Sequence, residues 1–164
     1  FRSGKEGQAM KESTGEKNSQ LTLLATILLG LGSMAAIDEI IFHQLLGWHH
    51  FVEANSSALA LASDGFLHTL ELILLVVGGV LLLRLYEKKL YAKGYQSAGF
   101  LLGMGGFQLF DGIVTHKIIG LHQVRYVDNL LLYDLAWNVS GLLLLLLGVG
   151  LLRRAKRRLA ANPS

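Results

Sequence analysis

The 164-residue chain contains no cysteine, a single proline and few charged residues. Without cysteine, the chain has no disulfide, no thiolate-bound metal and no iron–sulfur cluster. The one proline, Pro163, lies at the C-terminal end, so we expect no proline kink within a helix. Charged residues make up 16% of the chain, against about a quarter of a typical soluble domain. The sequence also lacks a phosphate-binding loop, a nucleotide-binding motif and a Ser–His–Asp pattern.

Hydrophobic residues make up 52% of the chain and are concentrated in four blocks. Each block has the roughly 20 mainly apolar residues that a membrane-spanning helix requires. The predicted spans are Leu21–Leu46, Ala58–Leu85, Ser97–Ile119 and Leu130–Leu152. We therefore predict an all-α integral membrane protein with one domain over residues 21–152, folded as a bundle of four transmembrane helices in contact with the lipid bilayer.

The two terminal segments are polar. Residues 1–20 are rich in Gly, Ser, Lys and Glu, a composition that predicts a disordered tail. Met10 is a candidate for the natural first residue, which would make residues 1–9 an added remnant. Residues 153–164 form a basic tail.

Lysine and arginine are distributed unequally between the two ends of the spans. Of the 15 such residues, all but Lys117 and Arg125 lie in the terminal tails, at the end of the second span, or between the second and third spans. Positive charge marks the cytoplasmic side, so we expect a multi-pass protein of the cell membrane with both termini in the cytoplasm. Because the charge sits at span ends and not on one folded face, nucleic acid is not an expected partner.

The first and third spans share a pattern of polar residues. Residues 32–49 match residues 105–122 at six of 18 positions, at an offset of 73. The matched polar residues are Asp38 with Asp111, His43 with His116, and His49 with His122. The second and fourth spans correspond at an offset of 70. We predict a duplicated helical hairpin, with repeats over about 21–86 and 97–152, related by a pseudo-two-fold axis along the membrane normal.

Ionisable side chains inside the spans are the candidates for function, because such groups are costly in hydrocarbon. Helical spacing places Glu39 beside His43, and Asp64 beside His68, since each pair is four residues apart. Imidazole and carboxylate together suit a transition metal such as zinc, iron or copper. The predicted metal ligands are His43, His68, His116, Asp38, Asp111, Glu39, Asp64, His49 and His122. Residues predicted to support them or to relay protons are Glu71, Asp134, Asn138 and His50.

The two halves are not chemically equal, which favours one specialised centre between the repeats over two equal ones. Gly112 stands where the first half has Glu39, and Asn138 where it has His68. The centre is expected in the outward half of the bilayer. The metal, its nuclearity, and the choice between storage, delivery and activation of oxygen or water stay open, and so does whether the protein is an enzyme.

Two other functions are compatible with the same residues. His43 and His116 are related by the predicted axis and could bind one haem iron from both sides. A ladder from His49 through Asp38 to Glu71 could instead conduct protons or ions. The apolar inner half of the spans argues against a complete pathway. The glycine-rich helix faces are equally compatible with a monomer and a homodimer.

The segments IDEIIFHQLLGWHH, ASDGFLHTLE and FDGIVTHKIIGLHQVR resemble a family of small bacterial and archaeal four-helix membrane proteins, domain of unknown function 2243. The resemblance extends from about Leu24 to Leu152. It implies a four-helix membrane fold but no established activity. It also implies a link to respiratory metal handling and to a partner in respiratory-complex assembly. The family often has Asp-Gly at the first motif, where this chain has Asp38-Glu39.

Overall fold

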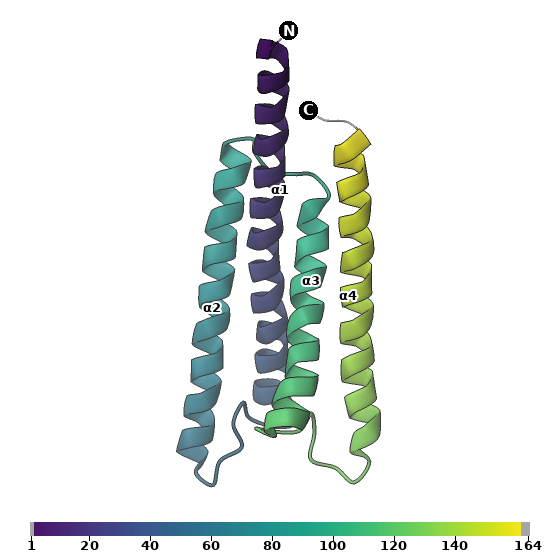
Figure 1. Ribbon diagram of the computed structural model, residues 1–164. Helices are drawn as coiled ribbons and strands as arrows, with labels where there is room; N and C mark the ends of the chain where they lie inside the picture. The colour runs from purple at the N-terminus through teal and green to yellow at the C-terminus, as the bar shows by residue number, and fades with distance from the viewer. Residues whose placement is uncertain (1, 162–164) are drawn as a thin grey trace.

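The computed structural model describes the backbone of residues 2–161 and the side chains of residues 15–161. Its four long helices are drawn in Figure 1. The first and third continue into π-helical segments, whose backbone hydrogen bonds join residues five apart. The elements are α1 (Arg2–Ile37), η1 (Asp38–Leu45), α2 (Ser57–Glu87), α3 (Tyr95–Leu109), η2 (Phe110–Ile119) and α4 (Leu130–Ala161). Residues 2–161 contain no strand, which confirms the all-helical prediction.

Each predicted span coincides with a helix that is long and apolar enough to cross a membrane. The four candidate spans are Gly15–Leu45, Ser57–Glu87, Tyr95–Ile119 and Leu130–Ala161. The apolar parts of the second and fourth are only 17% buried within the protein, against 39% and 44% for the first and third. A helix whose unburied faces are apolar is suited to contact with lipid. The predicted contact with the bilayer therefore falls mainly on α2 and α4.

The prediction of a disordered N-terminal tail is wrong for residues 2–20, which are helical. Helix α1 begins at Arg2 and runs without a break into the first span. Once the span provides a helical nucleus, each further residue adds a backbone hydrogen bond at little cost. Composition alone does not show this effect, because it treats the tail as a separate segment.

Helices α1 and α3 pack closely together at the centre of the molecule, and each has a glycine at the point of closest approach. A Cβ atom on Gly30 would overlap the carbonyl oxygen of Phe100 and lie 2.9 Å from Met104 N. A Cβ atom on Gly103 would overlap the carbonyl of Ile27 and lie 2.8 Å from Leu31 N. The two backbones can approach this closely only because neither glycine has a side chain.

The other two helices flank this central pair (Figure 1). Helix α2 packs on α1 and helix α4 packs on α3, while the described residues of α2 and α4 do not contact each other. The order across the molecule is therefore α2, α1, α3, α4. The contacts between α1 and α3 join equivalent positions of the two halves. The residues beside Gly103 (27 and 31) and those beside Gly30 (100 and 104) are related by the same offset of 73. The duplication itself stays a prediction.

The two ends of the bundle differ in charge and in loop structure. The start of α1, the end of α4 and the α2–α3 connection lie at one end, with most of the lysine and arginine (Figure 1). The η1–α2 and η2–α4 loops lie at the other end, together with the π-helical segments. The polar residues predicted for the site belong mainly to this second end.

Candidate metal centre

The π-helical ends of the first and third spans each bring an aspartate to a histidine. Asp38 and His43 are five residues apart in η1, as are Asp111 and His116 in η2. In a π-helix, residues five apart lie one above the other on the same face. His43 Nε2 is 3.6 Å from Asp38 Oδ2, and His116 Nε2 is 2.9 Å from Asp111 Oδ2. All four side chains are buried.

Two loop histidines lie between these pairs. The rings of His49 and His122 are stacked, with centroids 4.5 Å apart and planes 7° apart. The ring of His43 lies 4.4 Å from that of His49, and the ring of His116 lies 4.5 Å from that of His122. The four imidazoles thus form a continuous series, with contributions from both halves of the chain.

Each loop histidine is held by the backbone of the opposite loop. His49 Nδ1 donates to the carbonyl of Val124 at 2.9 Å, and His122 Nδ1 donates to the carbonyl of Phe51 at 2.8 Å. Because a carbonyl can only accept, the proton of each neutral ring is on Nδ1. Each Nε2 therefore carries a lone pair. A backbone carbonyl on the second ring nitrogen is the usual support for a histidine that binds a metal.

Glycine allows both loops to turn into these positions. Gly47 and Gly120 follow the two π-helical segments, with φ of 57° and 71°. These left-handed values are readily adopted by glycine and cost other residues energy. The two glycines are related by the same 73-residue offset as the histidines that follow them.

Burial keeps both loop histidines uncharged. It lowers the pKa of His49 to about 2 and that of His122 to about 4, with further lowering from the neighbouring imidazoles. Both values lie below the ordinary 6.5, so both rings are neutral at physiological pH. Neutral imidazole is the form that binds a metal ion.

We expect the metal-free protein to lose stability as the pH falls from 6.5 towards 4. In that range the unfolded chain protonates His49 and His122, whereas the folded protein keeps them neutral. Each such histidine lowers the free energy of unfolding by up to about 1.4 kcal/mol per pH unit. Thermal unfolding in detergent, followed by circular dichroism across this range, measures the slope. His122→Gln should reduce it, and an unchanged slope would contradict the assignment.

The site is rich in buried polar atoms that lack a hydrogen-bond partner. They include Glu39 Oε2, both ring nitrogens of His43, His49 Nε2 and Asp111 Oδ2. Several of these lie close to one another, as in the 2.8 Å separation of His43 Nδ1 from Glu39 Oε2, without the alignment of a hydrogen bond. Buried polar atoms are rarely left unpaired in proteins. Groups of residues that converge in this way have the arrangement that can hold a metal ion.

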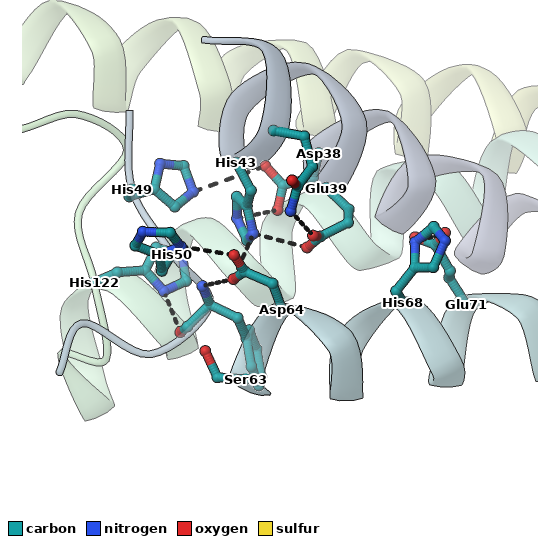
Figure 2. A network of polar contacts seen from close by, with 12 residues as sticks. Asp38, Glu39, His43, His49, His50, Ser63, Asp64, His68, Glu71 and His122 are labelled. Atoms are coloured by element: carbon teal, nitrogen blue, oxygen red, sulfur yellow. Dashed lines mark hydrogen bonds and ion pairs between the residues drawn. The ribbon is translucent and has the colours of Figure 1, made fainter. Parts of the chain in front are cut away.

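The first half adds a second group of carboxylates to the site, shown in Figure 2. Asp64, from α2, places Oδ1 3.2 Å from His43 Nδ1 and accepts a hydrogen bond from Phe51 N at 2.7 Å. His50 Nδ1 lies 2.6 Å from Asp64 Oδ2, and the His50 side chain is 38% exposed. Glu39 Oε1 accepts a hydrogen bond from Gln44 Nε2 at 2.9 Å.

The second half lacks this group. A Cβ atom on Gly112 would lie 2.5 Å from Asn138 Oδ1, so Asn138 fills the space that Glu39 has in the first half. Asp134 pairs with the ammonium of Lys117 at 2.6 Å. The side chain of Asn138 donates to the Asp134 carbonyl. The inequality of the halves that the sequence predicts is therefore present in the structure, and neither Asp134 nor Asn138 reaches the histidines.

His68 does not join the other predicted ligands. Its side chain is 49% exposed on α2, and its Nδ1 lies 2.6 Å from Glu71 Oε1 (Figure 2). Helix α2 packs on the protein along Asp64, Leu67 and Glu71, all of them buried. His68 lies one position beyond this contact face, on the exposed side of α2. The four-residue spacing predicts that Asp64 and His68 lie on the same face of α2 and both contact the rest of the protein. The face that makes this contact is narrower and does not include His68.

Sequence reasoning misses several parts of the site. The carbonyls of Phe51 and Val124 orient the loop histidines, and Lys117 neutralises Asp134. Applying the 73-residue offset to the loops relates residue 51 to residue 124 and points to the two carbonyls. The ion pair of Lys117 has no such signal, because its counterpart in the repeat is the neutral Gln44.

Comparisons with known proteins agree with this fold. A family model described as a predicted membrane protein (DUF2243) matches residues 25–155. No curated protein and no solved structure matches the chain. The matched region covers most of the first and fourth helical spans, all of the second and third, and every polar residue of the centre. The chain therefore belongs to the DUF2243 family of predicted membrane proteins.

Proposed function

We propose that the protein binds a transition-metal ion within the membrane domain, at the end of the bundle where the two halves meet. The ligands of this centre are drawn from His43, His49, His116 and His122, with Asp38 and Asp111. The observation that carries the proposal is the convergence of buried nitrogen and oxygen atoms from both halves, several of which have no hydrogen-bond partner. His43, His49 and His122 offer ligand atoms within 4.8 Å of one another, as do Asp111, His116 and His122.

The geometry favours a single ion in this histidine-rich centre. His122 belongs to both groups of ligands, and its Nδ1 already donates to Phe51. Its Nε2 has one lone pair and can bind only one ion, so the two groups of ligands cannot each hold a separate ion through His122. A mainly imidazole ligand set with carboxylate suits zinc, copper or iron.

The other two functions fit the arrangement less well. The rings of His49 and His122 lie between those of His43 and His116, which leaves a porphyrin no place between the two predicted axial ligands. A pathway across the membrane has no continuation beyond Glu71. Between Glu71 and Arg84 on α2, and between Asp134 and Arg153 on α4, the chain has no ionisable residue.

The distribution of charge supports an outward-facing centre. Lysine and arginine gather at the end of the bundle that holds both termini, which by the positive-inside rule is the cytoplasmic end. The centre then faces the outside of the cell membrane, where it can take up a metal ion through the two histidine-containing loops. A homodimer and a respiratory assembly partner stay predictions.

Metal analysis of the purified protein tests the proposal. We expect wild-type protein, isolated gently in detergent and loaded with zinc, to retain the ion through gel filtration. His43→Ala and His116→Ala should each weaken zinc binding by at least about 100-fold, because each removes an imidazole ligand that lies beside an aspartate of the same centre. The readout is zinc per chain, measured by inductively coupled plasma mass spectrometry.

His68→Ala is the matched control, since it removes a histidine from the same membrane domain but not from the centre. It should retain zinc like the wild type. The proposal fails if wild-type protein holds less than stoichiometric zinc, or if His68→Ala loses zinc as readily as His43→Ala.

A further inference from the structure

Glu39, Asp64 and His43 form a second cluster beside the histidine-rich centre. Their ligand atoms lie within 4.8 Å of one another, and all three residues are buried. His43 takes part on both sides. Its Nε2 faces Asp38 of the histidine-rich centre, whereas its Nδ1 faces Glu39 Oε2 at 2.8 Å and Asp64 Oδ1 at 3.2 Å.

The cluster has unsatisfied ligand atoms of its own. Glu39 Oε2 and His43 Nδ1 are buried and have no aligned hydrogen-bond partner. Glu39 is only 2% exposed. Two carboxylates and an imidazole removed from water need a compensating cation, because uncompensated buried charge is costly.

The second half of the chain supplies such a cation itself. Asp134 corresponds to Asp64 in the repeat, and the Lys117 ammonium binds it at 2.6 Å. The counterpart of Lys117 in the first half is Gln44, which is neutral and donates only a hydrogen bond to Glu39 Oε1. The first half thus has more carboxylate than the second and no lysine to balance it.

We propose that Glu39, Asp64 and His43 Nδ1 bind a second divalent transition-metal ion. The site rests on the proposed function in sharing His43 with the histidine-rich centre. To bind an ion at each ring nitrogen, His43 releases its remaining N–H proton to water and bridges the two ions as an imidazolate. Two carboxylates balance the charge of a divalent ion. Their oxygens, with a single imidazole nitrogen, suit manganese, ferrous iron or zinc more than the histidine-rich centre does.

His50 connects this second site to the surface. Its ring is 38% exposed and its Nδ1 contacts Asp64 Oδ2 at 2.6 Å (Figure 2). Of the residues that touch the cluster, His50 thus lies on the outer side, in the η1–α2 loop. An ion that arrives from outside meets His50 and Asp64 before it reaches His43.

Two single substitutions, each giving Gln44 or Lys117 the residue found at the other position, provide the test and its control. Full-length protein in detergent is stripped with a chelator, loaded with zinc and gel-filtered, and zinc per chain is counted. We expect about two zinc ions for the wild type and about one for Gln44→Lys, because the new ammonium replaces the second ion as Lys117 does at Asp134. Glu39→Gln, which removes a ligand without adding charge, should also bind about one.

Lys117→Gln is the matched control. It removes the ammonium from Asp134, but Gly112 offers no second carboxylate there, so the count should stay at the wild-type value. One zinc in the wild type and one in Gln44→Lys would overturn the second site and leave the histidine-rich centre standing. Two zinc ions in both Gln44→Lys and Glu39→Gln would also overturn it. No zinc in the wild type would overturn both proposals.

Discussion

His122→Ala is expected to weaken metal binding at the histidine-rich centre more than any other single histidine substitution. His122 belongs to both groups of potential ligands in the histidine-rich centre and is only 2% exposed. Its removal also leaves the Phe51 carbonyl without the ring nitrogen that binds it, so the η1–α2 loop loses a contact with the other half. Loss of a ligand and of its support together should weaken zinc binding by well over about 100-fold. Competition with a chromophoric chelator measures this affinity.

Gln123→Ala is the comparison for this variant. Gln123 follows His122 in the same loop, but its side chain accepts a hydrogen bond from Lys117 at the exposed surface. It should bind zinc with wild-type affinity. If His122→Ala kept its zinc while His43→Ala lost it, the ion would have to lie away from the two histidine-containing loops.

Gly103→Ala should separate the two central helices. The added methyl group overlaps the carbonyl of Ile27 and lies 2.9 Å from Gly30 Cα, and neither is a side chain that can move aside. Overpacking of this kind costs about 1–3 kcal/mol, and more where backbone must shift. Because Asp111 and His116 continue from the same helix, the two halves of the centre should also move apart. We expect a lower unfolding temperature and weaker zinc binding in the same variant.

Gly106→Ala provides the control for this effect. Gly106 lies one turn further along α3, and nothing is within 4 Å of a Cβ atom built on it. Alanine is the better helix former by about 1 kcal/mol, so this variant should be as stable as the wild type or slightly more stable. Equal destabilisation by both substitutions would show that the close approach of α1 and α3 is unimportant.

Much of the fold follows from the sequence, because hydrophobic length and repeated polar residues are strong signals. The four spans and the residues that meet at one end of the bundle follow from these signals. Asp38, His43 and His49 in one half converge with Asp111, His116 and His122 in the other, as the repeat predicts. Whether these residues bind metal stays a prediction.

The parts that sequence reasoning misses depend on backbone geometry. Asp38 and His43 are five residues apart, a spacing that puts them on different faces of an α-helix. They meet because the chain is wound as a π-helix from Asp38 onward, and no residue type in the sequence indicates the change from α-helix to π-helix. His68 shows the opposite error, since its α-helical spacing is right but α2 touches the protein over too narrow a face to include it.

The exchange of hydrogen bonds between the two histidine loops has a consequence for how the centre comes into being. The carbonyl that orients His49 lies in the second hairpin, and the carbonyl that orients His122 lies in the first. A hairpin by itself therefore has the nitrogen atoms but not the support that aims them. Neither half is a smaller version of the whole. The centre is a joint property of both hairpins, and it is complete only when the two loops lie against each other.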